Sequence, residues 1–267
     1  MKYSNLHNHT VFSDGKQTVE ENARAAIERG MCSIGFSDHS FTDIDTSYCM
    51  MAEDYPAYIA EVKRVKQEYS DRIKVYLGIE KDYYSTLNAA DFDYVIGSVH
   101  YIVEGGVTYP IDHSPEQQRD CIDTAFGGDV LAMAQRYFSM VAEQARTARP
   151  TFIGHFDVIN KFSLTPEEDP RYVRLVLDAL EQTVKYCPYL EINTGGMSRG
   201  WRSFPYPSPY VLSALREMGG KVLLGADSHD TKNLTFYFDE SVEIAKKAGY
   251  KTISVFNGKG FDEVEIP

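Results

Sequence analysis

The feature that most constrains the fold of this chain is a regular alternation of short apolar segments with amphipathic ones. The apolar segments have the length and the content of β-branched and aromatic residues that strands prefer. The predicted strands cover residues 3–7, 33–37, 73–79, 94–99, 151–154, 190–193, 222–226 and 252–256. Strands that alternate with helices are typical of a parallel α/β fold, and this number of strands favours a closed barrel over a doubly wound sheet.

Capping motifs mark where several of the intervening helices begin. Thr18 and Glu21 have the spacing of a capping box. Serine followed by proline, at 114–115 and 208–209, is typical of a helix start with proline in the first turn. Thr165, followed by proline and two glutamates, gives another start signal. We therefore expect helices over 18–30, 54–69, 129–148, 165–186, 208–219 and 240–248, with a further helical stretch after Ser114.

Histidine and acidic residues recur at one kind of place, the carboxyl end of a predicted strand. The residues at these ends are His7, His39, Glu80, His100, His155 and Asp227. In a (β/α) barrel such ends converge on one face, where the active site is built. Six of the 7 histidines, all except His113, lie at or just beyond a strand end, whereas scattered structural histidines would show no such phase. The sequence therefore predicts one cluster of imidazoles and carboxylates.

The first strand carries the most suggestive part of this pattern. Side chains two residues apart on an extended segment point to the same side, so His7 and His9 present two imidazoles to one point. Asp14 follows in a turn with Gly15 and can add a carboxylate. A lone His-x-His pair would fit an exposed edge strand equally well. The recurrence of ligand-type residues along the chain favours a metal site.

Composition limits the possible partners. The formal net charge of −12 and the pI near 5.0 argue against binding of long nucleic acids. A small anionic ligand is still compatible with this charge, because bound divalent metals invert the local potential. Four widely spaced cysteines indicate reduced thiols and a cytoplasmic protein. No apolar stretch is long enough to span a membrane, and the lack of a linker or repeat favours a single domain over residues 1–267.

Several motifs together resemble the PHP (polymerase and histidinol phosphatase) domain family, and within it the histidinol-phosphate phosphatases. They occur in the family's order over nearly the whole chain, at residues 7–15, 34–39, 78–80, 93–100, 153–155, 191–194, 206–209 and 224–229. The resemblance implies a distorted (β/α)7 barrel, one strand short of the usual eight. It also implies three metal ions at the carboxyl face of the barrel.

Carried over position by position, the resemblance implies a ligand set for each metal, with Glu80 bridging the first two ions. The sets are His7, His9, Glu80 and Asp227 for the first; Glu80, His100 and His155 for the second; and Asp14, His39 and His229 for the third. Mixed imidazole and carboxylate ligands suit zinc, iron or manganese. Glu80, Asp227 and His229 are the expected catalytic residues.

The expected chemistry is hydrolysis of a phosphate ester. Two cations lower the pKa of a shared water towards ~7, so that hydroxide can attack phosphorus without a serine or cysteine nucleophile. Protein cations would complete the phosphate site. Arg199 and Arg202 follow the strand that ends at Asn193, and Lys161 lies six residues beyond His155. Arginine can bind phosphate through two parallel hydrogen bonds, but each of these residues could instead be a solvated surface charge.

Three functions stay open on this basis. The first is hydrolysis of L-histidinol phosphate, a small phosphorylated substrate, to L-histidinol and phosphate in histidine biosynthesis. The second is another phosphoesterase activity of the same superfamily, on nucleotides or nucleic-acid ends. The third is a metal-binding module without catalysis, which would require missing ligands, whereas all candidate ligands are present here. A panel of phosphate monoesters would discriminate among them.

Overall fold

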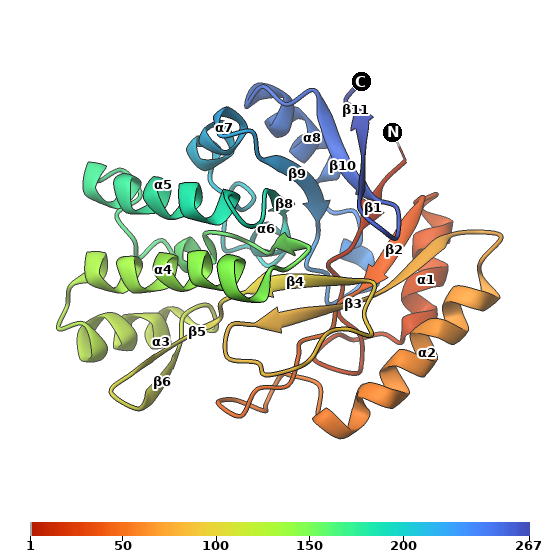
Figure 1. Ribbon diagram of the computed structural model, residues 1–267, viewed down its shortest axis with the longest axis horizontal. Coiled ribbons are helices and arrows are strands. Elements are labelled where there is room, and N and C mark those ends of the chain that lie inside the picture. Colours follow the sequence, from red (N-terminus) through yellow and green to blue (C-terminus); the bar gives the residue numbers. More distant parts are fainter. Residues whose placement is uncertain (1) are drawn as a thin grey trace.

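Seven parallel strands form the central sheet, with the spatial order β1-β2-β3-β4-β7-β8-β9 (Figure 1). The computed structural model describes residues 2–267. The barrel strands are β1 (Ser4–Asn5), β2 (Ser33–Phe36), β3 (Lys74–Asp82), β4 (Tyr94–Ser98), β7 (Phe152–Ile153), β8 (Tyr189–Asn193) and β9 (Lys221–Gly225). Each is close to a predicted strand, so the prediction of a parallel barrel from the alternation of elements is confirmed.

The sheet curls until its first and last strands meet. Beyond the end of β1, Asn8 bridges Ser228 in parallel, since the His9 amide donates to the Ser228 carbonyl at 2.9 Å. The Ser228 amide in turn donates to the His7 carbonyl at 3.1 Å. These bonds bring the loop after β9 against the segment that carries the His-x-His pair. The fold is therefore a nearly closed seven-stranded barrel, as the resemblance implied.

Helices flank the barrel on the outside and connect one strand to the next. They are α1 (Val19–Glu28), α2 (Tyr55–Glu68), α3 (Pro115–Asp120), α4 (Val130–Ala148), α5 (Pro170–Val184), α6 (Gly195–Ser198), α7 (Pro209–Glu217) and α8 (Phe238–Lys247). Short 3-10 turns lie at Ala52–Asp54, Val158–Asn160 and Thr231–Asn233, and a π-helical turn at Cys121–Ala125 follows α3. Among the described residues no helix is both long enough and apolar enough to span a membrane.

The caps explain where these helices begin. Thr18 and Glu21 form the predicted capping box of α1, and Ser114 accepts a bond from the Gln117 amide at the start of α3. The prediction that a helix starts at Thr165 is wrong. The Thr165 hydroxyl donates to Asn160 at 2.7 Å. The helix α5 begins at Pro170 instead, where proline fits the first turn and the preceding residue is an aspartate N-cap.

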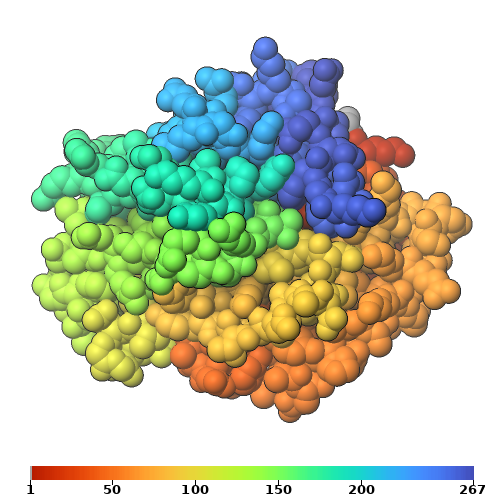
Figure 2. Space-filling model, in the orientation of Figure 1, coloured from red at the N-terminus to blue at the C-terminus, as the bar shows by residue number. Residues whose placement is uncertain are grey.

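Two antiparallel hairpins lie outside the barrel sheet. The first pairs β5 (Tyr101–Glu104) with β6 (Val107–Pro110), a hairpin that the sequence pattern did not predict. The second pairs the predicted strand β10 (Thr252–Phe256) with β11 (Phe261–Glu265). Figure 2 shows this C-terminal segment next to the N-terminal residues on the surface. The two ends of the chain therefore lie together, away from the carboxyl ends of the strands (Figure 1).

Candidate metal centre

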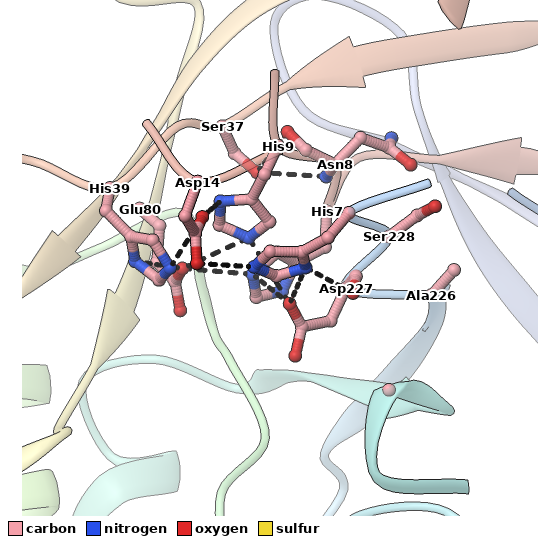
Figure 3. Close-up of polar contacts among 12 residues, drawn as sticks. His7, Asn8, His9, Asp14, Ser37, His39, Glu80, Ala226, Asp227 and Ser228 are labelled. Atoms are coloured by element: carbon pink, nitrogen blue, oxygen red, sulfur yellow. Dashed lines mark hydrogen bonds and ion pairs between the residues drawn. The ribbon is translucent and has the colours of Figure 1, made fainter. Parts of the chain in front are cut away.

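Nine side chains converge at the carboxyl ends of the barrel strands. Every one of them belongs to the set predicted from the sequence: His7, His9, Asp14, His39, Glu80, His100, His155, Asp227 and His229. Within this set, four groups of three or four residues offer ligand atoms that all lie within 4.8 Å of one another. Figure 3 shows part of the cluster, with imidazoles from the β1 and β2 ends pointing towards Glu80 and Asp227.

Glu80 lies at the centre of the cluster, and its two carboxylate oxygens face different neighbours. It occupies the last part of β3, two residues before the strand ends, and is 1% exposed. Its Oε2 atom is 3.2 Å from His7 Nε2 and 2.9 Å from His39 Nδ1. The same atom is 3.5 Å from His9 Nε2. This side of the carboxylate therefore faces the end of β1 and the end of β2.

The other oxygen of Glu80 faces the far side of the barrel. Its Oε1 atom is 3.0 Å from His155 Nε2 and 3.3 Å from His100 Nε2. The Ser98 hydroxyl donates to the same oxygen at 2.6 Å, which fixes the rotation of the carboxylate. Because each oxygen faces a separate pair or trio of imidazoles, Glu80 has the geometry of a bridging ligand.

Asp14 closes the open side of the cluster. His229 Nε2 is 3.1 Å from Asp14 Oδ2, and His39 Nε2 is 3.7 Å from Asp14 Oδ1. His9 also belongs to this group, with its Nδ1 atom 3.8 Å from Asp14 Oδ1. On the other side of His9, its Nε2 atom is 3.3 Å from Asp227 Oδ1. The rings of His9 and His229 are stacked, with centroids 4.1 Å apart.

Glu191 orients the first imidazole of the cluster. This carboxylate on β8 is 1% exposed, and its Oε1 atom is 2.9 Å from His7 Nδ1. It also accepts from the His155 amide at 2.8 Å and from Asn193 Nδ2 at 2.7 Å. Because Glu191 holds Nδ1, the Nε2 atom of His7 faces the Glu80 carboxylate at 3.2 Å. Although burial alone would lower the pKa of His7, the carboxylates of Glu191 and Glu80 raise it, so a metal ion bound at Nε2 would take the place of a proton there.

Buried polar atoms without partners provide a test of whether metals fit here. Among the described residues, His7 Nε2, both ring nitrogens of His9, Glu80 Oε2 and His155 Nδ1 lack a hydrogen-bond partner. Buried polar groups are normally satisfied. Metal–ligand bonds of about 2.0–2.2 Å place neighbouring ligand atoms about 3.0–3.5 Å apart, close to the spacings around Glu80. The donor set therefore fits transition-metal ions.

The electrostatics of the cluster also favour cations. Burial alone would raise the pKa of Glu80, but the nearby imidazoles of His7 and His39 hold it well below its usual value. The pKa of Asp227 is likewise held low despite burial, chiefly by Arg199. Burial, with the neighbouring His229 and His39, lowers the pKa of His9 to about 3. The carboxylates are therefore ionised and His9 is neutral. Despite their burial, His7, His39 and His100 have raised pKa values because Glu80 and other carboxylates face them, so metal binding would displace protons from these imidazoles.

Further carboxylates support the cluster from behind. Asp38 accepts bonds from the Thr10 amide at 2.8 Å and from the Ser13 hydroxyl at 2.6 Å, so it holds the turn that leads to Asp14. On the opposite side, Asp82 lies 3.2 Å from His100 Nδ1. Neither Asp82 nor Glu191 was predicted as a site residue. Glu191 is an acidic residue within an otherwise apolar strand, and this signal could have identified it, whereas Asp82 ends β3 directly after Glu80 and Lys81 and gives no such signal.

A pocket of about 260 Å³ opens over the cluster. Its floor includes cluster residues such as Asp14, His39 and Asp227. Its remaining walls come from loops beyond the strand ends and from the start of the β5–β6 hairpin. These wall residues include Tyr48, Tyr101, Asp112, Lys161, Arg199 and Tyr206.

Two of the three predicted substrate-binding cations line this pocket. Arg199 donates from Nη1 to Asp227 Oδ2 at 3.2 Å, and its Nη2 atom is 2.9 Å from His229 Nδ1. Its side chain remains 31% exposed. Lys161 Nζ donates to the Asp112 carbonyl at 2.5 Å and lies 3.3 Å from the carboxylate of the same residue. Both cations therefore lie at the pocket wall, where protein groups already bind part of each side chain: Asp227 and His229 for Arg199, and Asp112 for Lys161.

The structure does not bring Arg202 to the pocket, so the prediction that it contacts substrate is not supported. Its side chain is 4% exposed and forms an ion pair with Glu167 at 2.6 Å. Its Nη1 atom also donates to the Asn160 carbonyl at 2.7 Å. The one-turn helix α6 redirects the chain after Asn193, and Arg202 therefore points back towards the loop before α5. Its charge stabilises that loop.

The sequence matches a known family over most of its length. Residues 5–195 match the PHP domain family model. A protein of Deinococcus radiodurans named as a probable histidinol-phosphatase is 33% identical over 251 residues, which cover 89% of this chain and 90% of that protein. The fold is a barrel that carries a cluster of imidazoles and carboxylates at its carboxyl face. This chain belongs to the PHP domain family.

Solved structures share the fold. A Listeria monocytogenes protein superposes with a TM-score of 0.77 at 20% identity, over 89% of this chain and 99% of that one. The histidinol phosphate phosphatase of Lactococcus lactis, complexed with zinc, L-histidinol and phosphate, gives a TM-score of 0.69 at 21% identity, over 98% of this chain and 99% of that one. At these identities the likeness concerns the fold, and it agrees with the barrel described above.

Proposed function

We propose that this protein is a metal-dependent phosphatase that hydrolyses L-histidinol phosphate to L-histidinol and inorganic phosphate. The observation that carries the proposal is the complete cluster around Glu80, six of whose nine residues line a pocket that Arg199 also lines. The near full-length similarity to the Deinococcus radiodurans protein supports the choice of substrate. A pocket of about 260 Å³ suits a small metabolite.

We propose three divalent transition metals, zinc, iron or manganese, as the cofactors. The side chains that would hold them are the nine of the cluster, with Glu80 shared between two ions. When bound, such ions lower the pKa of a coordinated water to about 7 and neutralise charge on phosphoryl oxygens. The zinc in the Lactococcus lactis structure supports this class of metal.

The chain's own residues would bind and orient the ester. Arg199 presents a guanidinium to the pocket while Asp227 and His229 hold its other edge, so the fork is already oriented before substrate arrives. Lys161 adds a second positive charge to the lining of the same pocket. We propose that Asp227 and His229 are catalytic because they line the pocket with these cations, and that Glu80 is catalytic because its two carboxylate oxygens lie against imidazoles on both sides of the cluster.

The hydrolysis itself needs no covalent enzyme intermediate. Water attacks phosphorus, the phosphorus–oxygen bond to the alcohol breaks, and the alcohol leaves with a proton. The residues described above would hold the phosphoryl group in line for this attack, and the charges of Arg199 and Lys161 would offset the charge that develops on its oxygens. The unpaired state of all four cysteines is compatible with our proposal that the enzyme acts in the reducing cytoplasm.

A substrate panel tests the proposal. Metal-loaded protein is incubated with L-histidinol phosphate, with nucleoside monophosphates and with a simple alkyl phosphate, and released phosphate is measured. We expect the highest kcat/KM for L-histidinol phosphate. A higher kcat/KM for a nucleotide would contradict the assignment of the substrate but not that of a phosphatase. The absence of phosphate release from every ester would contradict both assignments.

A further inference from the structure

The hydroxyl group of Tyr206 is buried beside the proposed active site and has no partner. The residue is 2% exposed, and its hydroxyl oxygen accepts or donates no hydrogen bond among residues 2–267. The same residue lines the pocket above the cluster. A buried unpaired hydroxyl costs folding free energy, and this one belongs to a residue that lines the pocket, so a bound ligand is one group that could satisfy it.

The backbone of Tyr206 is fixed firmly, so the ring position is defined. Its amide donates to the Asn193 carbonyl at 2.9 Å, and its carbonyl accepts from the Asn193 amide at 2.7 Å. These two bonds form an antiparallel bridge at the end of β8. The tyrosine is therefore attached to the same strand end that leads into the loop carrying Arg199.

Two consecutive glycines make room for the hydroxyl and for the guanidinium. A Cβ atom at Gly196 would lie 2.6 Å from the Tyr206 hydroxyl oxygen. A Cβ atom at Gly195 would lie 2.7 Å from Arg199 Nη1 and equally close to Asp227 Oδ2. The start of α6 is thus a flat surface against which both donors pack. Burial raises the pKa of Tyr206 well above its usual value, so the phenol keeps its proton.

We propose that the Tyr206 hydroxyl donates a hydrogen bond to a phosphoryl oxygen of the bound ester, beside Arg199. This inference rests on the proposed function only in that the ligand carries a phosphoryl group. The phenol of Tyr206 packs against Gly196 and the guanidinium of Arg199 packs against Gly195. The two groups would bind two oxygens of one phosphoryl group. Tyr206 would then be a substrate-binding residue that neither the strand-end pattern nor the charge pattern of the sequence predicts.

The test compares Tyr206→Phe with the wild type, both as full-length, metal-loaded protein. Binding of inorganic phosphate is measured by calorimetry, together with metal content and Tm. Because the lost bond is to a charged acceptor, we expect the Kd for phosphate to rise about 10- to 100-fold. Metal content should not change, and Tm should stay the same or rise, since the variant removes an unsatisfied buried group.

Tyr210→Phe is the matched control. The Tyr210 hydroxyl is also buried without a partner, but this residue is not among those that line the pocket. Its removal should leave the affinity for phosphate unchanged. An unchanged Kd in Tyr206→Phe would overturn the proposal and would mean that water alone satisfies the hydroxyl. Lost metal would also overturn it, because the phenol would then support the cluster instead of the ligand.

The outcomes separate this inference from the proposed substrate. If the wild type binds phosphate but does not hydrolyse L-histidinol phosphate, the substrate assignment fails. The role of Tyr206 is then still decided by whether Tyr206→Phe weakens phosphate binding. If hydrolysis is observed and Tyr206→Phe behaves as wild type in phosphate binding, only the role of Tyr206 fails.

Discussion

At the scale of single residues, Arg199 connects the candidate metal cluster to the pocket. Its guanidinium contacts both Asp227 and His229 and still faces the pocket. Arg199→Ala should lower kcat/KM by about 10- to 1000-fold, which corresponds to roughly 1.4–4 kcal/mol of transition-state stabilisation. Arg199→Lys keeps the charge but loses the planar fork, so we expect it to recover only part of the loss.

Steady-state kinetics and metal analysis of both variants check this prediction. Arg174→Ala is the control, because that side chain is 83% exposed on α5. It should behave as wild type. Kinetics within error of wild type for Arg199→Ala would remove Arg199 from the site, and loss of bound metal would show that it mainly supports Asp227 and His229.

A second prediction at this scale concerns Glu191, which we expect to affect metal affinity. Glu191→Gln keeps the volume and one acceptor but removes the negative charge, and its amide NH₂ group would replace Oε2, which is 3.0 Å from His7 Nδ1. Changes to such supporting carboxylates typically cost about 10- to 100-fold in metal affinity or activity. We expect a loss of this size in a competition titration with a metal chelator.

The control for Glu191 is another buried carboxylate that contacts no imidazole. Asp157 is fully buried and accepts bonds from the amide and the hydroxyl of Ser208, at 2.9 and 2.7 Å. Asp157→Asn should lose stability without losing metal affinity. Equal metal affinities for Glu191→Gln and the wild type would mean that Glu191 only satisfies the backbone of His155 and the side chain of Asn193.

At the scale of elements, strand ends explain why so much of the site could be predicted. The period-two alternation fixes which side chains share a face, and parallel strands bring their carboxyl ends together whatever the loops do. Ligand-type residues at these ends therefore converge without any knowledge of loop structure. The barrel and the clustered side chains follow from this regularity, together with the His-x-His pair and the turn at Asp14, whereas the assignment of the side chains to three ions came from the family resemblance.

Loops and strand interiors account for what the sequence did not predict. The direction of Arg202 depends on a short helix that the pattern gives no sign of, and its partner Glu167 lies in another loop. Tyr206 reaches the pocket only through its backbone bridge to Asn193. Glu191 lies within an apolar strand, where burial of a carboxylate is costly unless a polar partner such as the His7 imidazole faces it.

Close packing of β8 against β9 gives a prediction at this scale. A Cβ atom at Gly225, the last residue of β9, would lie 2.1 Å from Glu191 Oε2. Gly225→Ala should displace that carboxylate, lower the free energy of unfolding by about 1–3 kcal/mol and weaken metal binding. Gly260→Ala is the control, since no atom lies within 4 Å of its added methyl group. Equal stability and metal content of the two variants would contradict the prediction.

At the scale of the whole molecule, the acidic charge and the buried cluster are linked. The chain carries a formal net charge of −12, and several of its carboxylates are concentrated at one end of the barrel. Without cations, the buried Glu80, the partly buried Asp227 and the exposed Asp14 repel one another, and partly protonated imidazoles must compensate. Bound divalent ions would relieve that repulsion only in the folded chain, because the unfolded chain does not hold the ligands together.

Metal removal should therefore lower the stability of the entire barrel as well as abolish activity. A ligand at 100 times its Kd stabilises the folded state by about 2.7 kcal/mol, and each kcal/mol shifts Tm by about 2–4 °C for a domain of this size. Chelation should accordingly lower Tm by about 5–10 °C for each site emptied. Adding back zinc or manganese should restore Tm and activity together, whereas magnesium should not, because it prefers oxygen ligands. The Glu191→Gln variant should need a higher metal concentration for the same recovery. A Tm that is independent of chelator and metal would show that the cluster is held together by its own hydrogen bonds and does not bind structural or catalytic ions.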